Sequence, residues 1–219
     1  MKGKVYDNPA CLQAPRNRFA PRWNPLYWGG AVGLVALIIA IKEELGEDQG
    51  KLIELGSACG ESGSMFAGSG VFEKVWLVDR WNYAGQFEVA EFNLRRYPCA
   101  EMVQGDMFEI AKQWEEQVDV IYLDAEHDYD SVMDGLETWD KHLRPGGIWA
   151  GHDYNLEVWP GVVMAVDEFF PESEIRVFED LSWMVIKTDS DDRARKDLSD
   201  LVDSFPVDHG DDPVYEVDK

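Results

Sequence analysis

Residues 52–62 read LIELGSACGES, a pattern typical of a buried strand that breaks into a glycine-rich turn and opens a helix. Such a turn exposes backbone N–H groups at a helix N-terminus, where a nucleotide-like ligand can bind. Glu54 lies inside the strand, Gly56 and Gly60 flank the turn, and Ala58 stands where a dinucleotide-binding fingerprint has its second glycine. The spacing therefore departs from G-x-G-x-x-G, and the turn alone does not identify its ligand.

Downstream of this turn, short apolar runs alternate with amphipathic stretches. The runs predict strands at 52–55, 75–78, 101–104, 118–123 and 148–150, and apolar residues at helical spacing predict helices over 87–97, 108–114 and 132–143. This alternation is typical of an α/β, doubly wound, mostly parallel sheet covered on both faces. The runs 174–179 and 182–188 are joined only by Asp180-Leu181, which predicts an antiparallel C-terminal hairpin.

The length of 219 residues and the 45% hydrophobic content fit one globular domain, which we expect to span 26–188. Residues 1–25 contain four prolines and no steady periodicity, so we expect an arm over the domain, either a lid or a dimer contact. From 189 to 219 the chain carries 11 acidic and 4 basic residues, which predicts a solvated acidic tail. The apolar run 26–41 is short for a membrane span, and we expect a buried helix that ends at the charged residues 42–44.

Composition also limits the partners. A formal net charge of −23 opposes binding to a phosphate backbone, so we expect no nucleic-acid partner and no membrane partner. Three scattered cysteines are too few for a disulfide framework or a zinc cluster, which favours a reducing compartment and a cytoplasmic location. The sequence leaves open whether the chain forms a homo-oligomer.

Polar residues follow every predicted parallel strand, and the carboxyl ends of such strands are where ligands bind. Asp79 lies 23 residues after Gly56, a distance at which an acid can accept hydrogen bonds from ribose hydroxyls; an ordinary turn or surface pair is the alternative. Asp106 could accept from an adenine amino group, although an acid after a glycine is also common turn chemistry.

A second group of polar residues follows the fourth and fifth strands: Asp124, His127, His152 and Asp153. Two carboxylates and one imidazole suit an octahedral divalent ion that keeps open positions for water. The alternative is structural, with Asp124 as a helix cap, His127 packed in the core and Asp153 in a tight loop. We favour a functional site, because two distant segments bring all four side chains to adjacent strand ends.

Three stretches of this chain carry a family resemblance: ELGSACGES, IYLDAEHDYDSV, and LRPGGIWAGHDY followed by PGVVMAVDEFF. Between residues 52 and 187 the chain resembles the class I S-adenosylmethionine-dependent methyltransferases, and within them the small metal-assisted O-methyltransferases that include macrolide-sugar methylating enzymes. The resemblance implies a Rossmann-like, seven-stranded sheet whose last hairpin supplies an antiparallel strand. It also implies S-adenosylmethionine as the cofactor and Mg²⁺ or another divalent cation as an assistant.

The resemblance assigns roles to individual residues. The methionine part of the cofactor would be surrounded by Glu54, Gly56, Ser57 and Gly60, the ribose would bind Asp79, and the adenine would bind Asp106. The cofactor set is completed by Ser62, Arg80, Gly105 and Asp124. The metal ligands would be Asp124, His152 and Asp153, where His152 departs from the acid or amide common in the family, and the catalytic residues would be His127 as base and Asp124.

These observations predict O-methylation of a hydroxyl on a small molecule, with a sugar or glycan unit as the first acceptor. Two alternatives stay open. One is a nicotinamide-dependent Rossmann oxidoreductase, which the glycine turn and Asp79 favour and Ala58 disfavours. The other is a non-catalytic, methyltransferase-like interaction module that uses the acidic tail as its contact surface.

Overall fold

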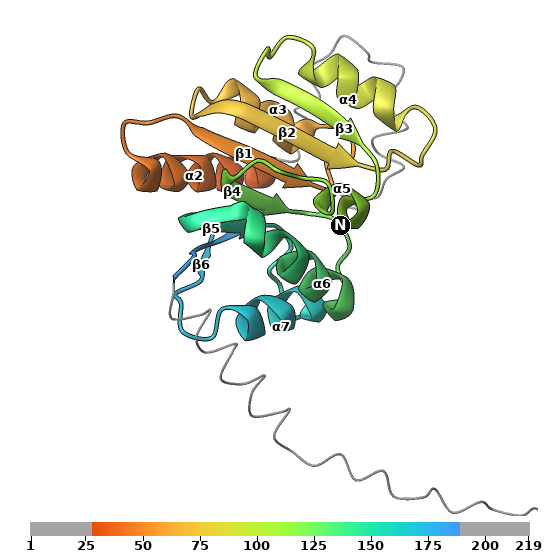
Figure 1. Cartoon of the computed structure of the whole chain (residues 1–219). Coiled ribbons are helices and arrows are strands. Elements are labelled where there is room, and N and C mark those ends of the chain that lie inside the picture. The colour runs from red at the N-terminus through yellow and green to blue at the C-terminus, as the bar shows by residue number, and fades with distance from the viewer. Residues whose placement is uncertain (1–27, 189–219) are drawn as a thin grey trace, which may run out of the picture.

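The computed structural model describes residues 28–188, a single α/β unit (Figure 1). The arm predicted at 1–25 and the tail predicted at 189–219 lie outside these residues. The helices are α2 (Trp28–Leu45), α3 (Glu61–Gly68), α4 (Gln86–Leu94), α5 (Met107–Ala111), α6 (Tyr129–Trp139) and α7 (Pro160–Phe169), with a 3₁₀ turn η3 (Asp140–His142). The strands are β1 (Gly50–Leu55), β2 (Phe72–Asp79), β3 (Ala100–Gln104), β4 (Val118–Leu123), β5 (Leu143–Gly151), β6 (Arg176–Val177) and β7 (Trp183–Ile186).

The strands form one seven-stranded sheet in the order β3-β2-β1-β4-β5-β7-β6. The first five strands run parallel, whereas β7 pairs antiparallel with both β5 and β6. The predicted doubly wound sheet with a C-terminal antiparallel hairpin is therefore confirmed. Strand order reverses between β1 and β4, so a ligand is expected beyond the carboxyl ends of these two strands.

Several predicted boundaries were wrong. Helix α2 does not end at 41 but continues to Leu45, because residues 42–44 are good helix formers that stay accessible to solvent. It ends at Gly46, which has φ +71° and donates its N–H to the carbonyl of Lys42. Strand β5 starts at Leu143 rather than at 148, and its pairing with β4 carries a register shift. Strand β6 is limited to two residues of the predicted run 174–179.

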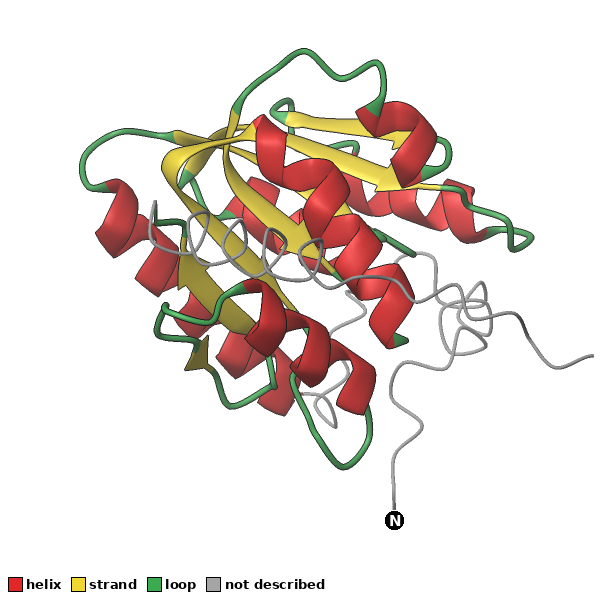
Figure 2. Ribbon diagram, turned by 60° about the horizontal axis from the view of Figure 1, so that its bottom comes forward, coloured by secondary structure: helices red, strands yellow, loops and turns green. Residues whose placement is uncertain are grey.

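Helices cover both faces of the sheet (Figure 2). Apolar side chains of α2, α3 and α4 pack on one face, and those of α5, α6 and α7 pack on the other. The central strand β4 is buried on both faces, which explains why all of its residues except Asp119 are apolar. The two layers fix the carboxyl ends of the parallel strands as one rigid edge.

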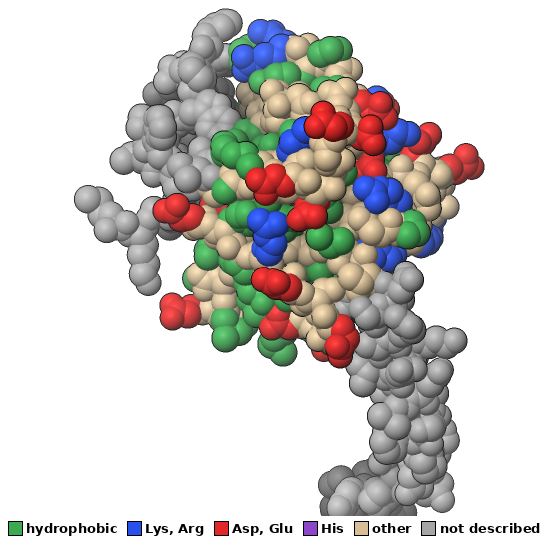
Figure 3. Space-filling model, turned by 90° about the vertical axis from the view of Figure 1, so that its left-hand side faces the viewer, with side chains coloured by type: hydrophobic (Ala, Val, Ile, Leu, Met, Phe, Trp, Pro, Cys, Tyr) green, Lys and Arg blue, Asp and Glu red, His purple; other side chains and the backbone are tan. Residues whose placement is uncertain are grey.

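The surface charge and the helix composition bear on whether nucleic acids or membranes are partners. On the face drawn in Figure 3, acidic and basic side chains are interspersed rather than gathered into one block. Among residues 28–188, no helix has both the length and the apolar character that crossing a bilayer requires.

Candidate functional site

The glycine-rich turn after β1 meets the loop after β4 at the reversal of strand order. Gly56 has φ +93°, and a Cβ built on it would lie 2.2 Å from the carbonyl oxygen of Asp124. No side chain fits at such a distance, so only glycine allows the two loops to approach this closely. The turn proposed to bind the cofactor therefore touches the loop that carries the proposed base.

Asp79, at the end of β2, holds this turn in place through hydrogen bonds. Ala58 has φ +43°, in the left-handed region, at the position where the dinucleotide fingerprint has glycine. Its N–H donates to Asp79 Oδ2 at 2.8 Å, and its carbonyl accepts from Trp81 Nε1 at 2.7 Å. Asp79 Oδ1 accepts from the Trp81 backbone N–H at 2.6 Å. Asp79 thus organises the turn with one lone pair of each oxygen and keeps acceptor capacity for ribose hydroxyls.

Glu54 lies fully buried beneath the turn. Burial raises the pKa of Glu54 to about 8, although a hydrogen bond from Ser62 opposes this effect. Glu54 Oε2 and Ser57 Oγ are buried and have no hydrogen-bond partner among residues 28–188. Because unpaired buried polar atoms are costly, these two atoms fit a site completed by a polar ligand, in which the Glu54 oxygen could accept from an ammonium group.

Arg80, predicted as a cofactor residue, and Asp106, predicted to bind the adenine, follow the ends of β2 and β3. Asp106 caps α5, because its Oδ1 accepts from the N–H groups of Phe108 and Glu109. Its Oδ2 lies 3.3 Å from Arg80 Nε, and Arg80 also reaches Glu126 at 3.9 Å. The structure therefore brings Arg80 next to Asp106, but it gives Asp106 a capping role that the sequence analysis had treated as the alternative.

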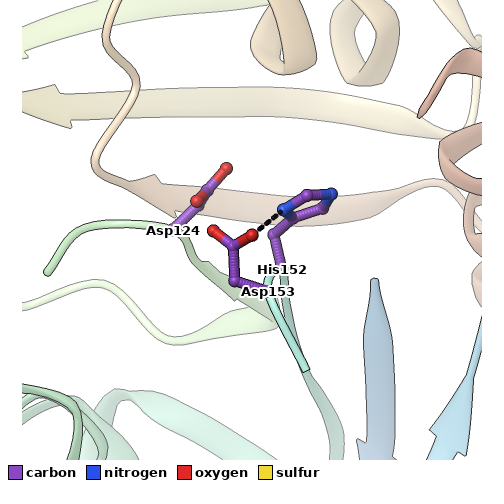
Figure 4. A group of neighbouring side chains, drawn as sticks. All are labelled: Asp124, His152 and Asp153. Atoms are coloured by element: carbon purple, nitrogen blue, oxygen red, sulfur yellow. Dashed lines mark ion pairs between the residues drawn. The ribbon is translucent and has the colours of Figure 1, made fainter. Parts of the chain in front are cut away.

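A compact polar cluster follows β4 and β5. Asp153 Oδ2 lies 2.6 Å from His127 Nε2, and Asp153 Oδ1 lies 3.1 Å from His152 Nδ1. Asp124, His152 and Asp153 each offer one ligand atom, all within 4.8 Å of one another (Figure 4). The carboxylate of Asp124 makes no hydrogen bond with any residue between 28 and 188. The structure thus brings together all four residues that the sequence analysis singled out here.

The backbone explains how consecutive residues join this cluster. Successive side chains of an extended strand point to opposite faces, so His152 and Asp153 would normally diverge. Asp153 instead has φ +63°, a left-handed conformation that is rare for a residue other than glycine. The resulting turn brings the two side chains into contact.

Burial and charge interactions shift the pKa values of the four side chains in this cluster. Burial alone lowers the pKa of His152, but the hydrogen bond to Asp153 and the charge of Asp124 raise it to about 9. For His127 the same opposing causes leave its pKa above the ordinary value. Burial raises the pKa of Asp153, yet hydrogen bonds from both histidines hold it well below its usual range. Burial raises the pKa of Asp124, against the opposing charge of His152.

Helix α7 braces the loop that carries His127. A Cβ on Gly161 would lie 2.7 Å from the His127 carbonyl oxygen and 2.5 Å from the Tyr129 nitrogen, so the helix start abuts this loop directly. Trp159, just before the helix, stacks on the His127 ring with a centroid distance of 4.3 Å and an interplanar angle of 26°. The stack fixes the plane of the imidazole.

The sequence analysis did not assign Trp159 or Asp180 to the site. Trp159 directly precedes the proline and glycine that open α7, which is a local signal of a helix start near a strand end. Asp180 was placed only in a hairpin connection, but its charge acts on both Asp124 and His152. Because β7 runs antiparallel to β5, it starts at the edge where the parallel strands end. The predicted hairpin therefore already implied that Asp180, just before β7, lies near the site.

The chemistry of these residues fits the two groups that the family resemblance implies. A small pocket is lined by the polar residues Asp124, Glu126, His127 and His152 and by the apolar residues Val132, Val162 and Trp183. Two carboxylates and an imidazole are suitable ligands for a divalent metal ion. The glycine turn, the unpaired Glu54 oxygen and Asp79 are suitable for a cofactor with an ammonium group and a ribose.

Comparisons with known proteins agree with this geometry. Residues 53–154 match the family model described as a methyltransferase domain, whereas no curated protein matches the chain. CalS11, a TDP-rhamnose 3'-O-methyltransferase of calicheamicin biosynthesis, is 15% identical with a TM-score of 0.59, covering 86% of this chain and 97% of its own.

Two further solved structures have the same fold. The O-methyltransferase NovP is 19% identical with a TM-score of 0.57, covering 71% of this chain and 79% of its own. An O-methyltransferase from Bacillus cereus, solved in complex with SAH, is 18% identical with a TM-score of 0.57, covering 85% and 93%. Residues 53–154 thus match a methyltransferase domain, and the chain shares its Rossmann-like fold with these solved O-methyltransferases.

Proposed function

We propose that this methyltransferase methylates a hydroxyl oxygen of a small molecule, with a sugar or glycan unit as the first candidate, and that a divalent cation assists. The observation that carries the proposal is the contact between Gly56 and Asp124, because it places the cofactor turn beside the His127 cluster. The sugar assignment is supported by likeness to CalS11, whose described substrate is TDP-rhamnose.

His127 has the surroundings of a general base. S-adenosylmethionine, when bound, supplies an electrophilic methyl group, whereas a sugar hydroxyl is a poor nucleophile near neutral pH. The hydrogen bond to Asp153 places the His127 proton on Nε2, which leaves Nδ1 as the proton acceptor. Nδ1 has no hydrogen-bond partner among residues 28–188, so it is available to the acceptor hydroxyl. A well-placed base of this kind contributes about a hundredfold or more to the rate.

The two carboxylate oxygens of Asp153 contact two different histidines. Its Oδ2 orients His127, while its Oδ1 faces His152 on the side where Asp124 lies. Asp124, His152 and Asp153 would hold the divalent cation, which lowers the pKa of a bound hydroxyl and orients it. Asp153 would thereby fix the base and the acceptor oxygen relative to each other, as transfer in line with the sulfonium requires.

The first experiment separates cofactor binding from transfer. Calorimetry with S-adenosylhomocysteine tests the cofactor site, and labelled S-adenosylmethionine with a panel of glycosides, phenols and simple alcohols tests the reaction. We expect His127→Ala to lower turnover about a hundredfold while leaving S-adenosylhomocysteine affinity unchanged. Asp130→Asn, on the exposed first turn of α6, serves as the control.

Three results would contradict parts of the proposal. Absence of cofactor binding at millimolar concentration would favour a non-catalytic module, particularly if deletion of 189–219 abolished capture of a partner. Full activity of His127→Ala would remove the base assignment. Unchanged turnover after thorough chelation would contradict only the proposal that a divalent cation assists the reaction.

A further inference from the structure

The third donor of the candidate metal site is an imidazole rather than a third oxygen. Asp124 follows β4, and His152 and Asp153 follow the neighbouring strand β5, so the rigid sheet edge holds all three. Figure 4 shows the two carboxylates and the imidazole close together at this edge. Whatever ion binds there must accept one nitrogen and two oxygen ligands.

The spacing of the ligand atoms suits one shared ion. His152 Nδ1 and Asp153 Oδ1 lie 3.1 Å apart. Adjacent corners of an octahedron with bonds of about 2.1 Å are about 3.0 Å apart, so both atoms can bind one ion with little movement. Asp124 has no hydrogen bond among residues 28–188 that an ion would have to displace. The left-handed backbone at Asp153 creates this spacing, and such a conformation costs about 1–3 kcal/mol and tends to occur at functional sites.

The surroundings further restrict the ion. The pocket that Asp124, Glu126 and His152 line is also lined by the apolar side chains of Val132, Val162 and Trp183. His127 holds the second oxygen of Asp153. An apolar wall limits the number of water ligands, and an oriented carboxylate is a better metal ligand. Mg²⁺ retains several waters and prefers oxygen ligands, whereas imidazole suits later first-row metals.

We infer that His152 makes this site selective for a late first-row transition-metal dication, of the Co²⁺ to Zn²⁺ class, over Mg²⁺. The inference rests on the proposed function, in which a divalent cation assists the reaction, and adds the chemical class of that cation. The affinity order follows the donor set: Mg²⁺ binds weakest, Mn²⁺ binds more tightly, and Co²⁺ and Zn²⁺ bind more tightly still. Replacing the nitrogen ligand with an oxygen ligand reduces this advantage.

Metal binding to the full-length, metal-stripped protein tests this without any methyl acceptor. Calorimetry with Co²⁺ and with Mg²⁺ is expected to give one site and an affinity for Co²⁺ about a hundredfold higher. Visible absorption of the Co²⁺ complex reports the ligand environment independently. His152→Asp is expected to reduce the ratio to about tenfold or less, with Asp124→Asn weakening both ions.

Controls keep the outcomes distinct. His209→Ala, outside the described residues, checks for coordination by an unrelated histidine and should leave the ratio unchanged, and His152→Asn provides a second oxygen donor if the aspartate variant does not fold. A wild-type ratio below tenfold, no Co²⁺ binding at millimolar concentration, or an unchanged ratio in a folded His152 variant would overturn the inference. S-adenosylhomocysteine binding, measured on the same samples, reports separately on the proposed function.

Discussion

Replacing Gly56 with alanine should separate the turn proposed to bind the cofactor from the loop that carries His127, the proposed base. The new Cβ would lie 2.2 Å from the Asp124 carbonyl oxygen, more than 1 Å inside the ordinary contact distance of about 3.4 Å. Overpacking of this kind costs about 1–3 kcal/mol. The φ of +93° adds about 1–2 kcal/mol for a residue with a side chain. We therefore expect the free energy of unfolding to fall by about 2–5 kcal/mol.

The chain offers a matched control for this substitution. Gly85 has φ +81°, but a Cβ there would have no atom within 4 Å, so Gly85→Ala carries the backbone cost without the clash. Urea denaturation measures both variants, and calorimetry measures their affinity for S-adenosylhomocysteine. We expect Gly56→Ala to lose at least 1 kcal/mol more than Gly85→Ala, and to lose cofactor affinity as well. Equal destabilisation of the two variants would refute the argument that the loops are in forced contact.

Substitutions at three other positions test separate parts of the site. Because the folded-state pKa of Glu54 is about 8, its contribution to stability is greatest below pH 4.5 and falls by roughly 1.4 kcal/mol per pH unit toward pH 8. Glu54→Gln should flatten that dependence in urea titrations, and an unchanged pH profile would contradict the buried-acid assignment. Trp159→Leu should lower kcat about tenfold by loosening His127 while Trp159→Phe retains most activity, and steady-state kinetics should show little change in the KM for cofactor. Asp79→Asn should weaken S-adenosylhomocysteine binding and destabilise the turn by about 1–3 kcal/mol, since the N–H of Ala58 loses a charged acceptor; thermal melting with and without ligand measures both effects.

The sequence predicted the fold well because its signals are local. Buried parallel strands are apolar on both faces, so β4 was predicted with its observed bounds, Val118–Leu123. The start of β5 was missed because residues 145–147 read Pro-Gly-Gly, which is typical of a turn. In the structure this stretch lies within the strand, next to the register shift against β4.

The site was predictable only where it depends on strand ends. Asp124 and Asp153 were found because parallel strands place their carboxyl ends together. The stack of Trp159 on His127 joins residues 32 positions apart through the packing of α7 on α6, which no periodicity encodes. The left-handed backbone of Ala58 was likewise hidden, because it depends on an aspartate 21 residues later.

The contact at Gly161 gives helix α7 and the loop before it different structural roles. Helix α7 braces the His127 loop through its backbone, while Leu156 and Val158, in the preceding loop, are 64% and 59% exposed. Those side chains can therefore change without displacing His127. The exposed side chains of this loop can therefore diverge during evolution while the position of His127 stays fixed.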